Sequence, residues 1–247
     1  TAASPNPEEG AALSRAIDLA RREGGELVLA TDPDADRLGI AVLHGGDFQL
    51  VTGNQLCALL ADFLISHHKP SNGKIGIVTT IVSSPMIQKV AHGYGAECPL
   101  VLTGFKWIAA VMREWEATPD APDFIYGTEE SYGYLIGKHC RDKDGIVASC
   151  VTAELAAHCR AAGKTIMDRL FELYQQHGVH YEWQKNITMP GIEGAKKMKS
   201  ILDAVREKPP AKVCGQAVVR FTRVDTGEVF ENGKKSGTIN LPRSDVF

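Results

Sequence analysis

Short apolar segments alternate with helix-forming segments along most of this chain, and this alternation limits the folds open to it. The sequence predicts strands at Lys74–Thr80, Glu97–Leu102 and Phe124–Tyr126, with helices at Ser84–Tyr94 and Phe105–Trp115 between them. A regular exchange of strand and helix is typical of α/β proteins, in which helices cover the faces of a sheet. We therefore expect an α/β fold of layered α/β/α domains with mixed sheets.

The alternation extends to both sides of this region and then changes. Further helices are expected at 8–23, 54–66, 145–160 and 165–176, and further strands at 27–30, 38–42 and 48–51. From His180 onward we expect a long strand, a charged helix at Glu193–Glu207 and a β-type run at Gln216–Val224. This change indicates the start of another domain, of the α+β type.

Composition is that of an ordinary globular enzyme and excludes some partners. The 247 residues carry a net charge of −3. The chain lacks the excess of basic residues that would indicate binding to nucleic acid. No stretch is long and apolar enough to predict a membrane helix, and no signal peptide opens the chain, so we expect a cytoplasmic location. The six cysteines show no C-x-x-C spacing and are expected to be buried, reduced thiols.

Three aspartates stand two residues apart between two apolar runs. Asp32, Asp34 and Asp36 precede Arg37, and in extended backbone the three carboxylates would point the same way. Without a countercharge they repel one another, whereas Mg²⁺ prefers a few hard oxygen ligands and leaves positions open for water or a phosphate. A guanidinium beside such an ion suits phosphate. The segment therefore predicts a metal site that handles phosphate.

Three other interpretations of this segment have to be weighed. An EF-hand is excluded, because its sixth and twelfth positions require Gly and Glu and here hold Arg37 and Leu43. A phosphatase of the haloacid dehalogenase type, with Asp32 as nucleophile, fits the preceding strand but leaves Asp36 and Arg37 unexplained. A solvated acidic turn is weakened by the flanking strands, since ligands bind at strand ends in α/β sheets.

A glycine-bracketed polar segment follows the strand expected at Phe124–Tyr126. It runs from Gly127 to Tyr134 and places Glu129 and Ser131 two residues apart, so that in extended backbone both face one way. An acid and a hydroxyl in this arrangement can hydrogen-bond neighbouring hydroxyls of a sugar. An exposed polar turn is the alternative, and the position after a strand favours a ligand.

Two cationic segments stand directly before helices. In the segment Thr103–Trp107, Lys106 stands at a helix N-terminus, where anions are favoured. The competing interpretation is a surface lysine beside aromatic side chains that dock the helix. Arg141 and Lys143 precede the helix that starts at Gly145 and suit a distal phosphate. Taken alone, the second segment is an ordinary charged loop.

Taken in order, these segments resemble the α-D-phosphohexomutase superfamily, that is, phosphoglucomutases and phosphomannomutases. By this resemblance Asp32, Asp34 and Asp36 would bind Mg²⁺, and Arg37 would contact the phosphate of a phosphoserine. Lys106 would lie near the reacting groups and aid proton transfer. The metal loop would thus serve phosphoryl transfer.

The resemblance also implies the substrate and the reaction. Glu129 and Ser131 would hold sugar hydroxyls, and Arg141 and Lys143 would bind the substrate. A phosphoserine would donate its phosphoryl group to a sugar monophosphate, and the bisphosphate would reorient and return its other phosphate, interconverting hexose 1-phosphate and hexose 6-phosphate. Glucose 1,6-bisphosphate would be the activator of the full-length enzyme. Specificity for mannose or pentose phosphates is an open alternative.

The resemblance divides the chain into three partial domains and marks it as a fragment. Residues 1–52 would be the C-terminal part of the second α/β domain, 53–180 the third α/β domain, and 181–247 the N-terminal part of the α+β fourth domain. Ser4 lies in a segment that lacks the His of the family's Thr-Ala-Ser-His-Asn-Pro motif, so we expect an ordinary residue before a helix. The missing partners would be an N-terminal serine domain and a C-terminal phosphate-binding segment. We expect no activity of the chain alone; a non-catalytic sugar-phosphate-binding module is the alternative.

Overall fold

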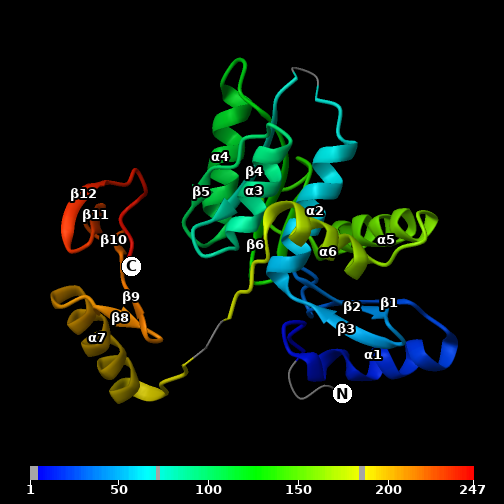
Figure 1. Cartoon of the computed structure of the whole chain (residues 1–247), viewed down its shortest axis with the longest axis horizontal. Coiled ribbons are helices and arrows are strands. Elements are labelled where there is room, and N and C mark those ends of the chain that lie inside the picture. The colour runs from blue at the N-terminus through cyan, green and yellow to red at the C-terminus, as the bar shows by residue number, and fades with distance from the viewer. Residues whose placement is uncertain (1–4, 71–72, 184–186) are drawn as a thin grey trace. The chain divides into compact units, whose positions relative to one another are not determined.

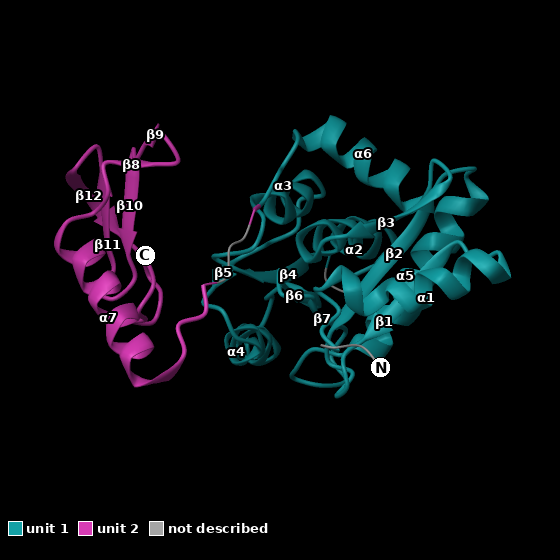
Figure 2. Cartoon of the chain, turned by 90° about the horizontal axis from the view of Figure 1, so that it is seen from below, with its two compact units in different colours: residues 1–182 teal, residues 183–247 magenta. Residues whose placement is uncertain are grey.

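A computed structural model describes residues 5–70, 73–183 and 187–247 of the chain (Figure 1). The chain divides into two compact units, residues 1–182 and residues 183–247, which have different colours in Figure 2. Ser4 lies outside the described residues. Within the part that is described, no helix is long and apolar enough to cross a membrane.

The first sheet is antiparallel and carries helix α1. Its elements follow one another in sequence: α1 (Gly10–Glu23), β1 (Leu27–Thr31), β2 (Leu38–His44) and β3 (Asp47–Val51). The strands pair in the order β1-β2-β3. Leu13 of α1 is buried together with Val28 of β1 and Ala41 of β2, because apolar residues at helical spacing face the sheet. The aspartate segment is therefore the loop of an antiparallel β1–β2 hairpin.

The second sheet is mixed, as predicted. Its strands lie in the order β5-β4-β6-β7, with β4 parallel to β5 and β6, and with β7 antiparallel to β6. The elements of this region are α2 (Gly53–His67), β4 (Ile75–Thr80), α3 (Pro85–Gly93), β5 (Leu100–Val101), α4 (Phe105–Ala117), β6 (Asp123–Glu129) and β7 (Gly133–Ile136).

Helices cover both faces of the mixed sheet, which makes three layers. Successive side chains of a strand point to opposite faces, and Ile77 and Val78 of β4 accordingly belong to different cores. Ile77 packs with α2 and α3, whereas Val78 packs with α4. Helices α5 (Gly145–Ala161) and α6 (Ile166–His177) complete the larger core. The predicted α/β/α layering is confirmed for this region.

The strand predicted at Glu97–Leu102 is shorter than expected. Only Leu100–Val101 forms strand β5, and Glu97 adds a single bridge to Gly76. Pro99 lies between the two pairing points and has no N–H group to donate to a neighbouring strand. The proline therefore interrupts the ladder.

The second unit begins with a helix and continues with short antiparallel strands. Its elements are α7 (Gly191–Glu207), β8 (Lys212–Val213), β9 (Gln216–Ala217), β10 (Arg220–Arg223), β11 (Glu228–Glu231) and β12 (Lys234–Thr238). The prediction of a long strand after His180 was wrong, because residues 180–183 and 187–190 form no strand. Residues 184–186 lie outside the described part. The predicted run at Gln216–Val224 is divided between β9 and β10.

The cysteines differ in burial, so the expectation of buried thiols was wrong for part of the set. Cys57, Cys98 and Cys159 are buried, whereas Cys150 and Cys214 are exposed, and all are free thiols. Membership of an apolar stretch does not decide exposure, because a helix turns some of its positions to solvent.

Candidate functional site

The aspartate loop is a turn, not extended backbone. Ala35 has a φ of 57°, and its N–H donates to the Asp32 carbonyl at 3.0 Å. Asp32 Oδ1 accepts hydrogen bonds from the backbone N–H groups of Asp36 at 3.1 Å and Arg37 at 3.0 Å. The alternation argument was therefore wrong in its reason, since the loop folds around the Asp32 carboxylate.

The three carboxylates nevertheless converge. Asp32, Asp34 and Asp36 each place a carboxylate oxygen within 4.8 Å of the other two. Burial raises the pKa of Asp32, and the nearby carboxylates of Asp36 and Asp34 add to this shift. Asp36 Oδ1 is buried and accepts no hydrogen bond from any described residue. A buried carboxylate oxygen that accepts no hydrogen bond is unfavourable unless a cation compensates it, so the donor set fits a hard divalent ion such as Mg²⁺.

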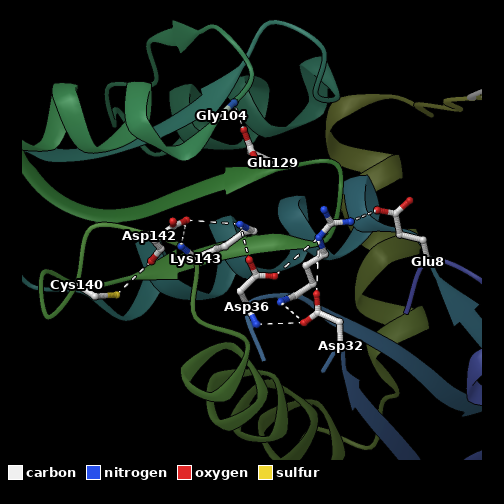
Figure 3. A network of polar contacts seen from close by, with 9 residues as sticks. Glu8, Asp32, Asp36, Gly104, Glu129, Cys140, Asp142 and Lys143 are labelled. Atoms are coloured by element: carbon white, nitrogen blue, oxygen red, sulfur yellow. Dashed lines mark hydrogen bonds and ion pairs between the residues drawn. The ribbon is translucent and has the colours of Figure 1, made fainter. Parts of the chain in front are cut away.

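Two cations flank the aspartates (Figure 3). Lys143 Nζ lies 2.6 Å from Asp36 Oδ2, and only 19% of the Lys143 side chain is exposed. Arg37 Nε lies 3.9 Å from both Asp32 Oδ2 and Asp36 Oδ1, and its Nη1 donates to Glu8 Oε1 at 2.9 Å. Burial lowers the pKa of Lys143, but the hydrogen bond to Asp36 and the negative charges of Asp142 and Asp36 outweigh it, and the net shift is upward. A phosphate at this point would meet fixed positive charge beside the carboxylates.

Backbone contacts hold the aspartate loop against the predicted sugar loop. The Leu38 N–H donates to the Tyr132 carbonyl at 3.1 Å, and Arg37 forms an isolated antiparallel bridge with Gly133. A Cβ at Gly133 would lie 2.9 Å from Lys143 Cδ, so the glycine leaves room for the lysine that reaches the aspartates. The two loops therefore form one structural site.

The N-terminus of α5 contacts the aspartate loop from another direction. The Gly145 N–H donates to the Ala35 carbonyl at 2.9 Å. A Cβ at Gly145 would lie 2.6 Å from the Arg37 carbonyl oxygen and 2.9 Å from that of Ala35. Both are backbone atoms that cannot rotate away, so this approach requires glycine.

The predicted sugar loop is the turn of a β-hairpin, whose second strand the sequence analysis missed. Strand β6 extends to Glu129 and pairs with β7 from Gly133 onward, and Tyr132 in the turn has a φ of 63°. Glu129 is buried, its Oε1 accepts a hydrogen bond from the Gly104 N–H at 2.5 Å, and burial raises its pKa. Ser131 is half-buried in the turn. The two side chains therefore do not share one extended strand, and that part of the reasoning was wrong.

A neighbouring acid, Glu130, has partners that the sequence analysis missed. Glu130 Oε2 accepts hydrogen bonds from Thr80 Oγ1 at 3.2 Å and Ser83 Oγ at 3.0 Å, and the Glu130 N–H donates to Ser83 Oγ at 3.2 Å. Ser83 lies just past the end of β4, so hydroxyl residues after a strand were the available signal. These bonds fix the hairpin turn to the carboxyl end of β4.

Two other predicted residues, Lys106 and Arg141, contact side chains outside the aspartate loop. Lys106 is exposed, and its Nζ lies 5.1 Å from the centre of the Trp107 ring, as in the competing interpretation. Arg141 donates to both carboxylate oxygens of Glu116, at 3.0 and 2.7 Å. Of the two cations before α5, Lys143 thus contacts the aspartate loop, while Arg141 pairs with helix α4.

Two family profiles match the chain. The one described as phosphoglucomutase/phosphomannomutase, alpha/beta/alpha domain III, matches residues 52–177, and the one for alpha/beta/alpha domain II matches residues 1–45. Among curated proteins, the phosphoglucomutases of Staphylococcus aureus strains MSSA476 and COL are 36% and 35% identical to this chain over 246 residues. These alignments cover 99% of this chain and 44% of each relative, so the chain spans less than half their length.

Solved structures share the fold. The phosphoprotein parafusin (phosphoglucomutase) from Paramecium, in its open form, matches with a TM-score of 0.60 at 24% identity, over 93% of this chain and 40% of that one. A phosphoglucomutase/phosphomannomutase family protein from Burkholderia thailandensis matches with a TM-score of 0.61 at 18% identity, over 87% of this chain and 42% of that one. With the domain III profile covering the mixed sheet and its helices, this chain belongs to the phosphoglucomutase/phosphomannomutase family.

Proposed function

We propose that this chain supplies the metal loop and the sugar loop of a phosphoglucomutase-type phosphotransferase that interconverts hexose 1-phosphate and hexose 6-phosphate. The observation that carries the proposal is the convergence of Asp32, Asp34 and Asp36 within 4.8 Å. Asp36 Oδ1 is buried and has no hydrogen-bond partner among the described residues, and Lys143 contacts the other oxygen of the same carboxylate. The names of the similar proteins support the reaction class.

In this proposal the three aspartates hold Mg²⁺. When bound, this ion supplies positive charge that stabilises the phosphoryl group during transfer. Asp32 Oδ1 accepts hydrogen bonds from two backbone N–H groups. These bonds fix the orientation of the carboxylate, and so of its other oxygen, before any ion binds. Such preorganisation lowers the reorganisation needed when the ion and the phosphate bind.

Arg37 and Lys143 are assigned to the phosphate of a phosphoserine and to the substrate. The guanidinium of Arg37 can donate two parallel hydrogen bonds to phosphate oxygens, while Lys143 acts as a point charge. Arg141 is proposed to bind the substrate phosphate after leaving Glu116, with which it now pairs. Lys106 would act near the reacting groups, where proton transfer needs a mobile donor.

Glu129 and Ser131 are assigned to the sugar hydroxyls. Glu129 accepts the Gly104 N–H through Oε1, and its second oxygen can accept from a hydroxyl. Hydroxyls at neighbouring ring positions offer similar donors and acceptors after the sugar turns over, so one loop can bind both orientations. This recognition does not separate glucose from mannose, and phosphomannomutase or phosphopentomutase specificity stays an alternative.

Two other classes of function are distinguishable from the mutase. A phosphatase of the Asp-x-Asp type would use Asp32 as nucleophile, but Asp32 lies in the loop of an antiparallel hairpin, with Oδ1 held by the N–H groups of Asp36 and Arg37. A non-catalytic sugar-phosphate-binding module would bind substrate without turnover in the full-length protein. We propose that the 247-residue chain alone is inactive, because the phosphoserine would come from another segment.

The proposal is tested by Mg²⁺ titration of the chain and by activity of the full-length protein that contains it. Asp34→Asn and Asp36→Asn should each weaken Mg²⁺ binding at least tenfold by calorimetry, whereas Asp18→Asn, at an exposed position of helix α1, should not. In a coupled glucose 1-phosphate assay the same two variants of the full-length protein should lose most of their turnover. Unchanged Mg²⁺ affinity in both variants would contradict the metal assignment, and turnover by the wild-type chain alone would contradict its proposed inactivity.

A further inference from the structure

A second cluster of metal-ligating side chains lies on the loop between β7 and α5. His139 Nε2 lies 2.9 Å from Asp144 Oδ2 and 3.3 Å from Cys140 Sγ, and ligand atoms of all three residues lie within 4.8 Å of one another. Across residues 5–70, 73–183 and 187–247, only this cluster and the aspartate loop bring three such groups together. The proposed mutase reaction does not use it.

The geometry at His139 differs from that of a catalytic relay. In a relay one ring nitrogen faces the nucleophile and the other faces the carboxylate. Here the same nitrogen, Nε2, faces both Cys140 Sγ and Asp144 Oδ2. Two ligands of a tetrahedral zinc ion lie roughly 3.4–3.6 Å apart, so a small outward movement of these atoms makes room for an ion.

The two carboxylate oxygens of Asp144 have separate contacts. Oδ1 accepts the N–H groups of Ile146 at 2.9 Å and Val147 at 3.0 Å and so caps helix α5. The cap fixes the side chain while Oδ2 faces His139. The His139 and Asp144 side chains are 45% and 25% exposed, so an ion can enter from solvent.

We propose that His139, Cys140 and Asp144 bind a borderline divalent cation of the zinc class, with water completing the coordination. One nitrogen, one sulfur and one carboxylate suit Zn²⁺ or Co²⁺, whereas Mg²⁺ prefers oxygen ligands alone. On binding, the Cys140 thiol releases its proton to solvent, gives up its hydrogen bond to the Asp142 carbonyl (Figure 3), and forms a metal–sulfur bond. This loop therefore selects a different cation from the aspartate loop.

The proposal is tested by titrating the 247-residue chain with Co²⁺ in excess Mg²⁺, which occupies the aspartate loop. The wild-type chain should develop a thiolate-to-cobalt charge-transfer band, and Zn²⁺ should abolish it by displacement. Cys140→Ser should lose the band, and His139→Asn should bind Co²⁺ at least tenfold more weakly. Asp144→Asn should weaken binding similarly, because it removes the charged ligand oxygen. The variant should still fold, since the amide oxygen can still cap α5. The exposed Cys150→Ser is the matched control and should keep the band.

A second measurement avoids any variant that fails to fold. In the wild-type chain, Zn²⁺ should slow alkylation of Cys140 at least tenfold, read from modified peptides by mass spectrometry, and leave exposed Cys214 unaffected. Absence of the charge-transfer band in the wild type overturns the proposal. So does a band that persists in a folded Cys140→Ser variant, or alkylation of Cys140 that Zn²⁺ does not slow.

Discussion

Lys143 Nζ lies 2.6 Å from Asp36 Oδ2, so the loop before α5 neutralises part of the aspartate loop. This contact occupies one oxygen of Asp36, while its other oxygen is buried without a hydrogen-bond partner among the described residues. The lysine and a metal ion would therefore share one carboxylate. Charge removed at Lys143 should change how the aspartates bind a cation.

Lys143→Ala is expected to tighten Mg²⁺ binding by the chain about threefold to tenfold, because a competing cation leaves Asp36. Calorimetric titration of the wild type and the variant measures the change. Lys164→Ala is the control, since Lys164 pairs with Glu172 and does not contact the aspartate loop. An unchanged or weaker affinity in Lys143→Ala would show that the lysine does not compete with the ion.

Gly145→Ala should destabilise the first unit by about 1–3 kcal/mol, because the new Cβ would meet two backbone carbonyl oxygens that cannot move alone. Mg²⁺ affinity should fall with it, since the displaced backbone carries the aspartates. Urea unfolding and Mg²⁺ titration provide the two readouts. Gly93→Ala is the matched control, because its Cβ would meet only the movable His177 ring, at 3.2 Å.

The Asp62–Arg169 ion pair should contribute strongly to stability. Arg169 donates to both oxygens of Asp62, at 2.9 and 2.7 Å, and the Asp62 side chain is only 6% exposed. Arg169→Ala leaves a buried carboxylate with fewer partners and should lower the free energy of unfolding by about 2–4 kcal/mol. Arg160→Ala, which breaks an exposed pair with Glu26, should cost at most about 0.5 kcal/mol. Equal losses in the two variants would contradict the assignment.

Asp123 should make the first unit sensitive to acid. Burial raises its pKa, but hydrogen bonds and charges from Lys138 and His68 outweigh this effect and lower the pKa from its ordinary value of 3.8. A carboxyl whose pKa is lower in the folded state contributes stability above its unfolded pKa, and this contribution is lost as the pH falls through the folded pKa. Asp123→Asn should therefore flatten the fall in unfolding free energy below about pH 5. A slope identical to that of the wild type would refute this.

The cysteines should react in the order of their exposure. Burial raises the pKa of the Cys57 and Cys98 thiols to about 12, so neither forms the reactive thiolate near neutral pH. Exposed Cys150 and Cys214 should be alkylated first in the native chain. Peptide mass spectrometry after timed iodoacetamide treatment measures the order, and early modification of Cys57 would contradict it.

The layered fold could be predicted because its signal is local. Apolar periodicity distinguished strand β4 at Ile75–Thr80 from helix α4 at Phe105–Ala117 without knowledge of their partners. The second strand of the hairpin could not be predicted in this way. Gly133–Ile136 becomes a strand only because it pairs with β6, and Tyr132 adopts a positive φ that its sequence does not announce.

The candidate site was predictable in its residue types and not in its contacts. Charge spacing identified Asp32, Asp34 and Asp36, but their convergence comes from a turn that no alternation rule describes. Arg141 and Lys143 stand in the same short loop, yet Arg141 pairs with Glu116 of α4 and Lys143 pairs with Asp36. Pairing across distant segments is a tertiary property.

The Gly145–Ala35 and Leu38–Tyr132 backbone hydrogen bonds limit which segments of related proteins can be exchanged. They link residues that the domain II profile matches to residues that the domain III profile matches. The two stretches are consequently not interchangeable modules. A chimera between relatives should keep its metal loop only if the hairpin turn and the start of α5 come from the same parent, and substitutions at these positions should be correlated through evolution.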